Sequence, residues 1–319
     1  MRLAAAGARV TVVDSSVTGC GANPVNLAGA GDRIRVVAAD IGDASIADEL
    51  TGAAVIFNLA GEISHIHSMR QPWRDAEINA AAQLRFLESC AHAVPAVRVV
   101  YAGTRQIYGV PQYLPVDESH PIQPVDFNGI HKYAATQYHL MWTELGRVDA
   151  RVLRLSNVYG PRMALNIPCQ GFLGNFLRRA LAGQTIEIFG DGRQVRDPLY
   201  IDDVVDAFLL AGAADDAQSR VWNVGGAETL PLARIAEMLC TCADAPPPVF
   251  RPFPDEHKSI DIGSYSTDTT RIRRELGWKP KVEFAAGARR SVEYYRETLP
   301  HYLPDALPRC ALDGRPVAV

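Results

Sequence analysis

Short, unbroken apolar runs alternate with longer amphipathic segments along the first half of the chain. The runs are rich in Val, Ile and Ala and lack the polar alternation of a strand that has one wet face. Such runs are typical of parallel strands that are buried on both faces. Two intervening segments, residues 75–93 and 129–146, are long enough to be crossover helices. The pattern therefore predicts a doubly wound α/β sheet, with strands in residues 9–14, 34–40, 54–61, 97–103 and 150–156.

The pattern becomes less regular after Asn157. Helices are predicted near residues 172–182, 201–213 and 232–239, with long loops and a proline-rich bridge between them. We expect this half to form a smaller α/β lobe over the carboxyl ends of the strands, where ligands of open α/β sheets bind. The expected organisation is a sheet domain at residues 1–160, a lobe at 161–303 and a frayed tail at 304–319.

Composition disfavours several classes of function. The 319 residues include 48% hydrophobic and 21% charged residues, and a formal net charge of −4 gives no basic footprint for nucleic acid. No apolar run reaches the ~18 residues that a membrane span requires, and no signal peptide opens the sequence. The six cysteines are scattered, so we expect neither a metal site nor disulfides, and Cys240 and Cys242 are interpreted as buried thiols. A small-molecule ligand and a cytoplasmic location remain as expectations.

Acidic residues end two of the predicted strands. A carboxylate such as Asp14 can accept both ribose hydroxyls of an adenosine and repel a 2′-phosphate, which favours NAD over NADP. A turn-forming aspartate is an equally good interpretation of this residue alone. Asp40 and Ile41 follow the next strand and are suited to contact an adenine ring.

A bound dinucleotide also needs a glycine-rich turn at a helix N-terminus, because backbone N–H groups and the helix dipole neutralise its pyrophosphate there. The sequence contains no such turn. Met1 to Ala6 resembles the last turn of the helix that should follow it, with Gly7 as the C-cap. We therefore expect that ~20 further residues, with a first strand and the glycine turn, belong upstream, and that the sheet has a central gap with two unpaired edges. The alternative is a natural chain that does without the motif.

Several short motifs occur in order and at regular spacing. They are FNLAG at 57–61, Asn79 in the following helix, GTRQIYG at 103–109, RLSNVYGPR at 154–162, GDGRQVRDPLYIDDVVDAF at 190–208, WNVGG at 222–226 and DTTRIRRELGWKPK at 268–281. With these motifs the chain resembles the extended short-chain dehydrogenase/reductases, in particular the UDP-glucose 4-epimerase-like members of the NAD-dependent nucleotide-sugar epimerase/dehydratase family. The resemblance extends from Ala4 to about Tyr295. It implies a Rossmann-type fold, NAD as cofactor, a nucleotide-diphosphate sugar as substrate and a homodimer built on the two long helices.

The resemblance also implies roles for individual residues. The cofactor would be contacted by Asp14, Asp40, Ile41, Leu59, Ala60, Gly61 and Asn79, with Lys132 on the nicotinamide ribose. Thr104, four residues before Tyr108, would be the catalytic Ser/Thr. The sugar would be contacted by Glu62, His65 and Asn157, and the diphosphate by Arg196 and Lys258, since charge-assisted bonds to phosphate are strong. Without the resemblance, Thr104 is a turn cap, Arg196 a surface ion pair with Asp197, and Lys132 a solvated helix residue.

One position departs from the family pattern. The family has a tyrosine four residues before the lysine, whose ammonium keeps the phenol acidic enough to take a proton as hydride leaves for NAD. Here that position holds Asn128, which cannot act as a base near neutrality. Alternative proton carriers are Glu62, His65, His67, His131 and Tyr133, although each taken singly is more simply a residue without that role.

A second departure bears on the type of reaction. Arg105 and Gln106 occupy the positions where the family's 4,6-dehydratases carry acidic residues, which disfavours sugar dehydration. The leading hypothesis is NAD-dependent epimerisation, or oxidation and reduction at one carbon, of a nucleotide-diphosphate sugar, with Thr104, Asn128 and Lys132 as the catalytic set. The second hypothesis is a protein that binds NAD or a nucleotide sugar, or has a regulatory role, and has lost catalysis.

Overall fold

Four parallel strands form the main sheet of the computed structural model, which describes residues 1–17, 21–167, 171–215 and 217–303. Val99, Val100 and Val152, in the two central strands, are fully buried, as expected for strands covered on both faces. The predicted doubly wound fold is thus confirmed. The strand order is β10-β5-β4-β3, with β3 at Val55–Asn58, β4 at Arg98–Thr104, β5 at Asp149–Leu155 and β10 at Val221–Val224.

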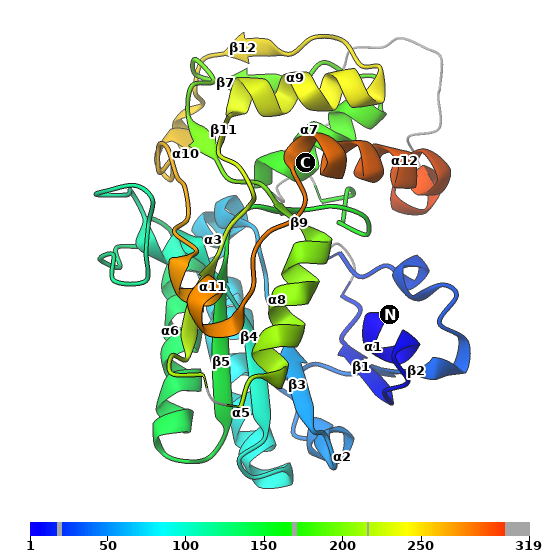
Figure 1. Cartoon of the computed structure of the whole chain (residues 1–319), viewed down its shortest axis with the longest axis vertical. Coiled ribbons are helices and arrows are strands. Elements are labelled where there is room, and N and C mark those ends of the chain that lie inside the picture. Colours follow the sequence, from blue (N-terminus) through cyan, green and yellow to red (C-terminus); the bar gives the residue numbers. More distant parts are fainter. Residues whose placement is uncertain (18–20, 168–170, 216, 304–319) are drawn as a thin grey trace.

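Helices cover both faces of this sheet (Figure 1). On one face, Phe86, Leu87 and Cys90 pack with Val99 and Ala150 in a buried cluster. On the other face, a cluster around Trp222 joins β10 to two helices that follow later in the chain. The first face is covered by α2 (Ile46–Leu50), α5 (Ala82–Ala93) and α6 (Phe127–Glu144), and the second by α8 (Ile201–Ala213) and α11 (Thr270–Leu276).

The first two strands form a separate small sheet. β1 (Val10–Asp14) pairs in parallel with β2 (Ile34–Ala38), and neither pairs with β3. Figure 1 shows this pair, with α1 (Arg2–Ala5), beside the edge of the four-stranded sheet that β3 forms. The sheet is therefore divided at the position where a gap was expected. That a further strand belongs in this gap stays a prediction.

A second lobe lies beyond one end of the main sheet (Figure 1). Its core is a cluster of buried side chains that includes Phe176, Ile188, Leu239 and Tyr295. The parallel strands β7 (Glu187–Phe189) and β12 (Val249–Arg251) form its small sheet. The main helices of the lobe are α7 (Gly171–Leu181), α9 (Leu232–Ala243) and α12 (Phe284–Tyr302), which pack on one another.

The chain crosses between the two parts more than once. α8, β10 and α11 follow residue 161 in the sequence, yet they pack on or pair with the main sheet. The expected boundary between residues 160 and 161 therefore does not separate the sheet domain from the lobe, and the expected tail lies outside the described residues. The remaining elements are η1 (Pro24–Leu27), η2 (Gly31–Arg33), α3 (His65–Arg70), α4 (Pro72–Ala76), the π-helical η3 (Glu77–Ala81), η4 (Arg105–Tyr108), β6 (Val158–Tyr159), β8 (Val195–Arg196), β9 (Leu199–Tyr200), β11 (Leu230–Pro231) and α10 (Asp255–Lys258).

No helix in the described part of the chain is long and apolar enough to cross a membrane. Within the same residues, no group of three or more His, Cys, Asp or Glu side chains is arranged to hold a metal ion. Of the cysteines described, Cys90 and Cys240 are buried and Cys242 is partly buried, and all three are free thiols. Cys20, Cys169 and Cys310 lie outside the described residues.

Candidate active site

Lys132 is buried in the second turn of α6, beside the turn that follows β3. Only 7% of the residue is exposed, and a Cβ added to Gly61 would lie 2.8 Å from the Lys132 Nζ and 2.7 Å from the Asn79 Oδ1. Burial lowers the pKa of Lys132 to about 8, against the opposing effects of Asp75 and Glu62. A glycine is therefore required where the lysine ammonium approaches the backbone, and the amine is poised to titrate near neutrality.

The turn itself is held by amide side chains. Asn79 accepts from the Glu62 N–H at 3.1 Å and donates to the Glu62 carbonyl at 3.0 Å. The Ala60 carbonyl accepts from the Gln83 Nε2 at 3.0 Å. Leu59, the residue before Ala60 in this turn, has an exposed side chain. The predicted cofactor residues of this turn thus lie together, and Gln83 is a supporting residue that the sequence did not reveal.

Asn128 is fixed by two acceptors, although it is only 1% exposed. Its Nδ2 donates to the Glu62 carbonyl at 2.8 Å and to the Asp75 Oδ2 at 3.0 Å, which uses both amide hydrogens. The Asp75 Oδ1 lies 2.7 Å from the Nδ1 of His131, one turn further along α6. Asp75, which the sequence analysis missed, therefore links Asn128 to a histidine. The available signal was its position, four residues before Asn79 and so on the same helix face.

A second histidine pairs with a second buried carboxylate. Asp126 is the N-cap of α6, where its Oδ1 accepts from the Gly129 N–H at 2.6 Å, as a capping aspartate should. Its Oδ2 accepts from the Gln106 Nε2 at 2.8 Å and lies 3.0 Å from the Nδ1 of His65. Burial opposes ionisation of Asp126, but these contacts hold its pKa below the usual value. His65 is thereby placed at the start of α3, facing the end of α6 that carries Asn128.

Thr104 ends β4, and its hydroxyl accepts from the Gln106 N–H at 3.2 Å. It thus caps the turn η4, which was the simpler interpretation of this residue. Tyr108, four residues further on, donates to Asn223 at 2.7 Å and accepts from Arg154 at 2.7 Å, which anchors the turn to β10 and β5. Whether Thr104 also contacts a substrate stays a prediction.

Two of the predicted substrate residues, Arg196 and Asn157, have a buried polar atom without a partner in the described chain. Arg196 donates through NH1 to the carbonyls of Val195 and Gly263, while its buried Nε has no hydrogen-bond partner in the described chain. Burial, followed by the charge of Arg105, lowers the pKa of Arg196 to about 10. The buried Oδ1 of Asn157 likewise has no partner there. Since buried polar groups are normally satisfied, these two atoms are suited to a polar ligand. Arg196 is buried and is not the surface ion pair of the alternative interpretation.

The remaining predicted residues lie in two other places. Lys258 is exposed at the end of α10, and no contact joins its side chain to Arg196 in the described structure. Asp14 and Asp40 follow paired parallel strands and are exposed at the same sheet edge. The Asp14 Oδ1 accepts from the Ser16 N–H at 2.7 Å, and the Asp40 Oδ1 from the Gly42 N–H at 2.8 Å. Each carboxylate thus shapes its own turn.

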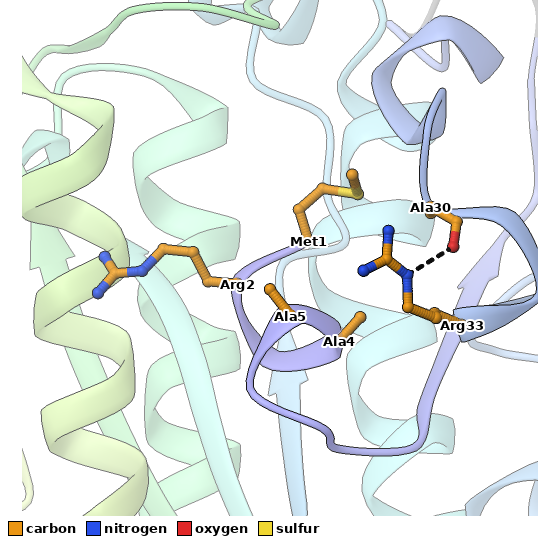
Figure 2. Close-up of a pocket in the computed structure, with 6 residues that line it drawn as sticks. All are labelled: Met1, Arg2, Ala4, Ala5, Ala30 and Arg33. Carbon is orange, nitrogen blue, oxygen red and sulfur yellow. Dashed lines mark hydrogen bonds between the residues drawn. The ribbon is translucent and has the colours of Figure 1, made fainter.

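A shallow apolar pocket of about 200 Å³ lies at the N-terminus, apart from these residues. Figure 2 shows it between α1 and the segment of Ala30 and Arg33, where the Arg33 Nε donates to the Ala30 carbonyl. None of its six lining residues belongs to the predicted site. They are Met1, Arg2, Ala4, Ala5, Ala30 and Arg33.

The described residues fit two ends of a dinucleotide. The Lys132 amine, which lies close against Gly61, suits the nicotinamide ribose, and the carboxylates of Asp14 at the end of β1 and Asp40 after β2 suit the adenosine. Fold and site together define a Rossmann-type nucleotide-dependent enzyme. A family model for the NAD dependent epimerase/dehydratase family matches residues 1–225, and the chain belongs to that family. NAD is the cofactor of this family.

Relatives cover nearly the whole chain. UDP-glucose 4-epimerase of Mycolicibacterium smegmatis is 33% identical over 92% of this chain and 93% of its own length. The crystal structure of Thermotoga maritima UDP-glucose 4-epimerase with UDP-glucose is 30% identical and aligns with a TM-score of 0.83 over 93% of this chain and 94% of that one. DesIV, the dTDP-glucose 4,6-dehydratase of Streptomyces venezuelae with NAD and TYD bound, is 29% identical, with a TM-score of 0.83 over 95% and 94%. The resemblance inferred from the motifs is confirmed.

Proposed function

We propose that the chain catalyses NAD-dependent epimerisation, or a related oxidation and reduction, at one carbon of a nucleotide-diphosphate sugar. The observation that carries this proposal is the buried amine of Lys132 against Gly61, because an amine is kept in such a place at a cost in stability. The similarity to two UDP-glucose 4-epimerases supports the same reaction.

The roles that we propose for the residues are those that the family resemblance implies. Hydride transfer from a sugar carbon, and its return to the other face of the keto sugar, would be the chemistry that NAD supplies when it is bound. Lys132 holds the nicotinamide ribose, and Thr104 holds the reacting hydroxyl. The diphosphate is bound by Arg196 and Lys258, and the sugar is contacted by Glu62, His65 and Asn157.

Asn128 leaves the proton to another group. His65 and His131 are the best candidates, because the ring of each lies close to a buried carboxylate that can orient it: the His65 Nδ1 is 3.0 Å from Asp126 and the His131 Nδ1 is 2.7 Å from Asp75. His67 is exposed, and Tyr133 packs against the cluster around Tyr108.

The second candidate function is a protein that binds the cofactor or the sugar nucleotide and has lost catalysis. It is favoured by one observation: the amide hydrogens of Asn128 are both used by Asp75 and the Glu62 carbonyl, so the position holds no titratable group. This candidate keeps the pocket and the lysine but assigns them to binding alone.

The two functions are separated by product analysis. The full chain is incubated with NAD and UDP- or dTDP-hexoses, and formation of the epimer is followed by chromatography. We expect turnover by the native chain, its loss in Lys132→Met, and a decrease of at least about tenfold in His65→Gln or His131→Gln. If product forms only after Asn128→Tyr, the native chain is a binding protein. Absence of both NAD binding and turnover in every variant would refute the proposal.

We also propose that the chain forms a homodimer through α3, α4 and α6. Large apolar side chains are exposed on these helices, among them Trp73 at 86%, Met69, Ile130 and Met141. Exposed apolar patches of this kind mark interaction surfaces. Light scattering should give twice the chain mass, and Trp73→Glu should give the monomer. A native monomer would contradict the proposal, and Phe250→Glu, an exposed position in β12, is the control.

A further inference from the structure

Arg105 is a cation for which the proposed function has no role. It begins η4, directly after Thr104, at the carboxyl end of β4. Since Thr104 is proposed to hold the reacting hydroxyl, the residue next to it belongs to the sugar end of the substrate site.

The guanidinium of Arg105 is held in place by neutral groups. Its NH1 donates to the Gln106 Oε1 at 3.1 Å, and its Cζ lies 5.0 Å from the centre of the Tyr265 ring. Gln106 is itself fixed, because its Nε2 donates to Asp126. The bond to Gln106 uses one of five guanidinium hydrogens, so the guanidinium is preorganised while most of its donors remain available.

No carboxylate forms an ion pair with Arg105 in the part of the chain that the structure describes. Three carboxylates act on its charge, and each also contacts another group: Asp126 at the helix N-cap, Asp197 through its Oδ2 with the Thr267 N–H, and Asp261 with Gln194 and Arg196. The Oδ1 of Asp197 has no hydrogen-bond partner in the described residues. Burial lowers the pKa of Arg105, and its charge in turn acts on Arg196. The Arg196 NH2 lies 3.9 Å from the Asp261 Oδ1, so Arg105 is the one of these two neighbouring guanidinium groups that has no ion pair in the described residues, which is costly unless an anion binds.

One such cation is accounted for by the diphosphate. Arg196 has a buried, unpartnered Nε and lies in the lobe, whereas Arg105 lies at the end of the sheet strand beside Thr104. We infer that Arg105 binds a carboxylate on the sugar ring, so that the chain prefers a nucleotide-diphosphate hexuronate to the corresponding neutral hexose. A planar fork matches a carboxylate with two parallel hydrogen bonds, which gives both affinity and selectivity. The inference rests on the proposed function and specifies its substrate class.

Binding affinities test this inference without requiring turnover. The full chain with NAD is titrated calorimetrically with the free nucleoside diphosphate, its glucose conjugate and its glucuronic acid conjugate, each in uridine and thymidine form. We expect the native chain to bind the hexuronate at least about tenfold more tightly than the hexose, as for a hydrogen-bonded charge pair. Arg105→Gln should abolish this preference and leave affinity for the free diphosphate unchanged, while Arg105→Lys should retain part of it.

Three results would overturn the inference. The first is a native chain that shows no preference for the hexuronate. The second is an Arg105→Gln variant whose affinity for the free diphosphate falls as much as its affinity for the sugar conjugates, which would make Arg105 a diphosphate ligand. The third is a chain that binds no sugar nucleotide at all, which would also remove the proposed function. Turnover of the neutral hexose without a hexuronate preference refutes the inference alone. The ratio of hexuronate affinity to hexose affinity is measured on the native chain, so the test still holds if Arg105→Gln fails to fold.

Discussion

Replacing Lys132 with methionine should stabilise the protein while removing its function. The folded chain holds this amine at a pKa of about 8, against 10.5 for an ordinary lysine. At about 1.36 kcal/mol per pKa unit, burial of the charged form costs about 3 kcal/mol. Methionine has a similar length and no charge, and Asp75 keeps its bonds to Asn128 and His131. Lys132→Met is therefore expected to raise the free energy of unfolding by up to about 3 kcal/mol below pH 8 and to weaken NAD binding.

The sign of the pH dependence follows from proton binding. Between pH 8 and 10.5 the unfolded chain keeps the lysine proton and the folded chain releases it, so the stability of the native protein rises with pH through this window. The loss of stability caused by burying the charged Lys132 is fully present below pH 8 and disappears above pH 10.5. The advantage of Lys132→Met should shrink accordingly.

Urea denaturation followed by tryptophan fluorescence, at intervals from pH 7 to 10.5, measures this difference. Titration of other groups cancels when variant and native curves are subtracted. Lys279→Met changes an exposed lysine and is the matched control, expected to leave the pH dependence as in the native protein. A variant that is less stable than the native protein at pH 7, or a difference that does not change with pH, would refute the reasoning.

Two further changes probe the same cluster. Asp75→Asn removes the negative charge and puts an NH2 donor in place of one of the two acceptor oxygens that Asn128 and His131 share. It should lower the free energy of unfolding by about 1–3 kcal/mol, and it should lower kcat by a larger factor than it changes KM. Asp32→Asn, at an exposed position, is the control, and equal effects of the two would contradict the role of Asp75. Gly61→Ala adds a Cβ within 3 Å of Lys132 and Asn79, so NAD affinity measured by calorimetry should fall at least about tenfold; unchanged affinity would place the cofactor elsewhere.

The strands of the sheet could be predicted where burial on both faces gives an unbroken run of apolar residues. β3, β4 and β5 lie in apolar runs because both faces of each strand are covered, and α7 and α8 were found within one residue of their observed bounds. β10 was missed because it has four residues, includes the polar Asn223, and pairs with β5 across a long stretch of chain. Its place depends on tertiary pairing, which a local pattern does not contain.

The main residues of the site could be predicted, but the hydrogen bonds that connect Asn128, Asp75 and His131 could not. Lys132 and Gly61 could be identified from the family resemblance that the motifs carry, and the structure brings them together. For Asp75 the sequence offered only its position four residues before Asn79, because a helix pattern does not say which acidic residue turns toward a neighbouring helix. The π-helical segment that follows α4 is likewise absent from the pattern.

The substitution at residue 128 has a consequence that depends on its neighbours. Both acceptors of its side chain, the Glu62 carbonyl and the Asp75 carboxylate, require a donor, so the amide nitrogen must face them and the oxygen must face away. The residue therefore offers a fixed hydrogen-bond acceptor at the position where the family has an ionisable phenol. An amide oxygen can orient a sugar hydroxyl but cannot remove its proton. Any catalysis must then move the proton through another group, and loss of turnover in only one of His65→Gln and His131→Gln would identify the histidine that carries it.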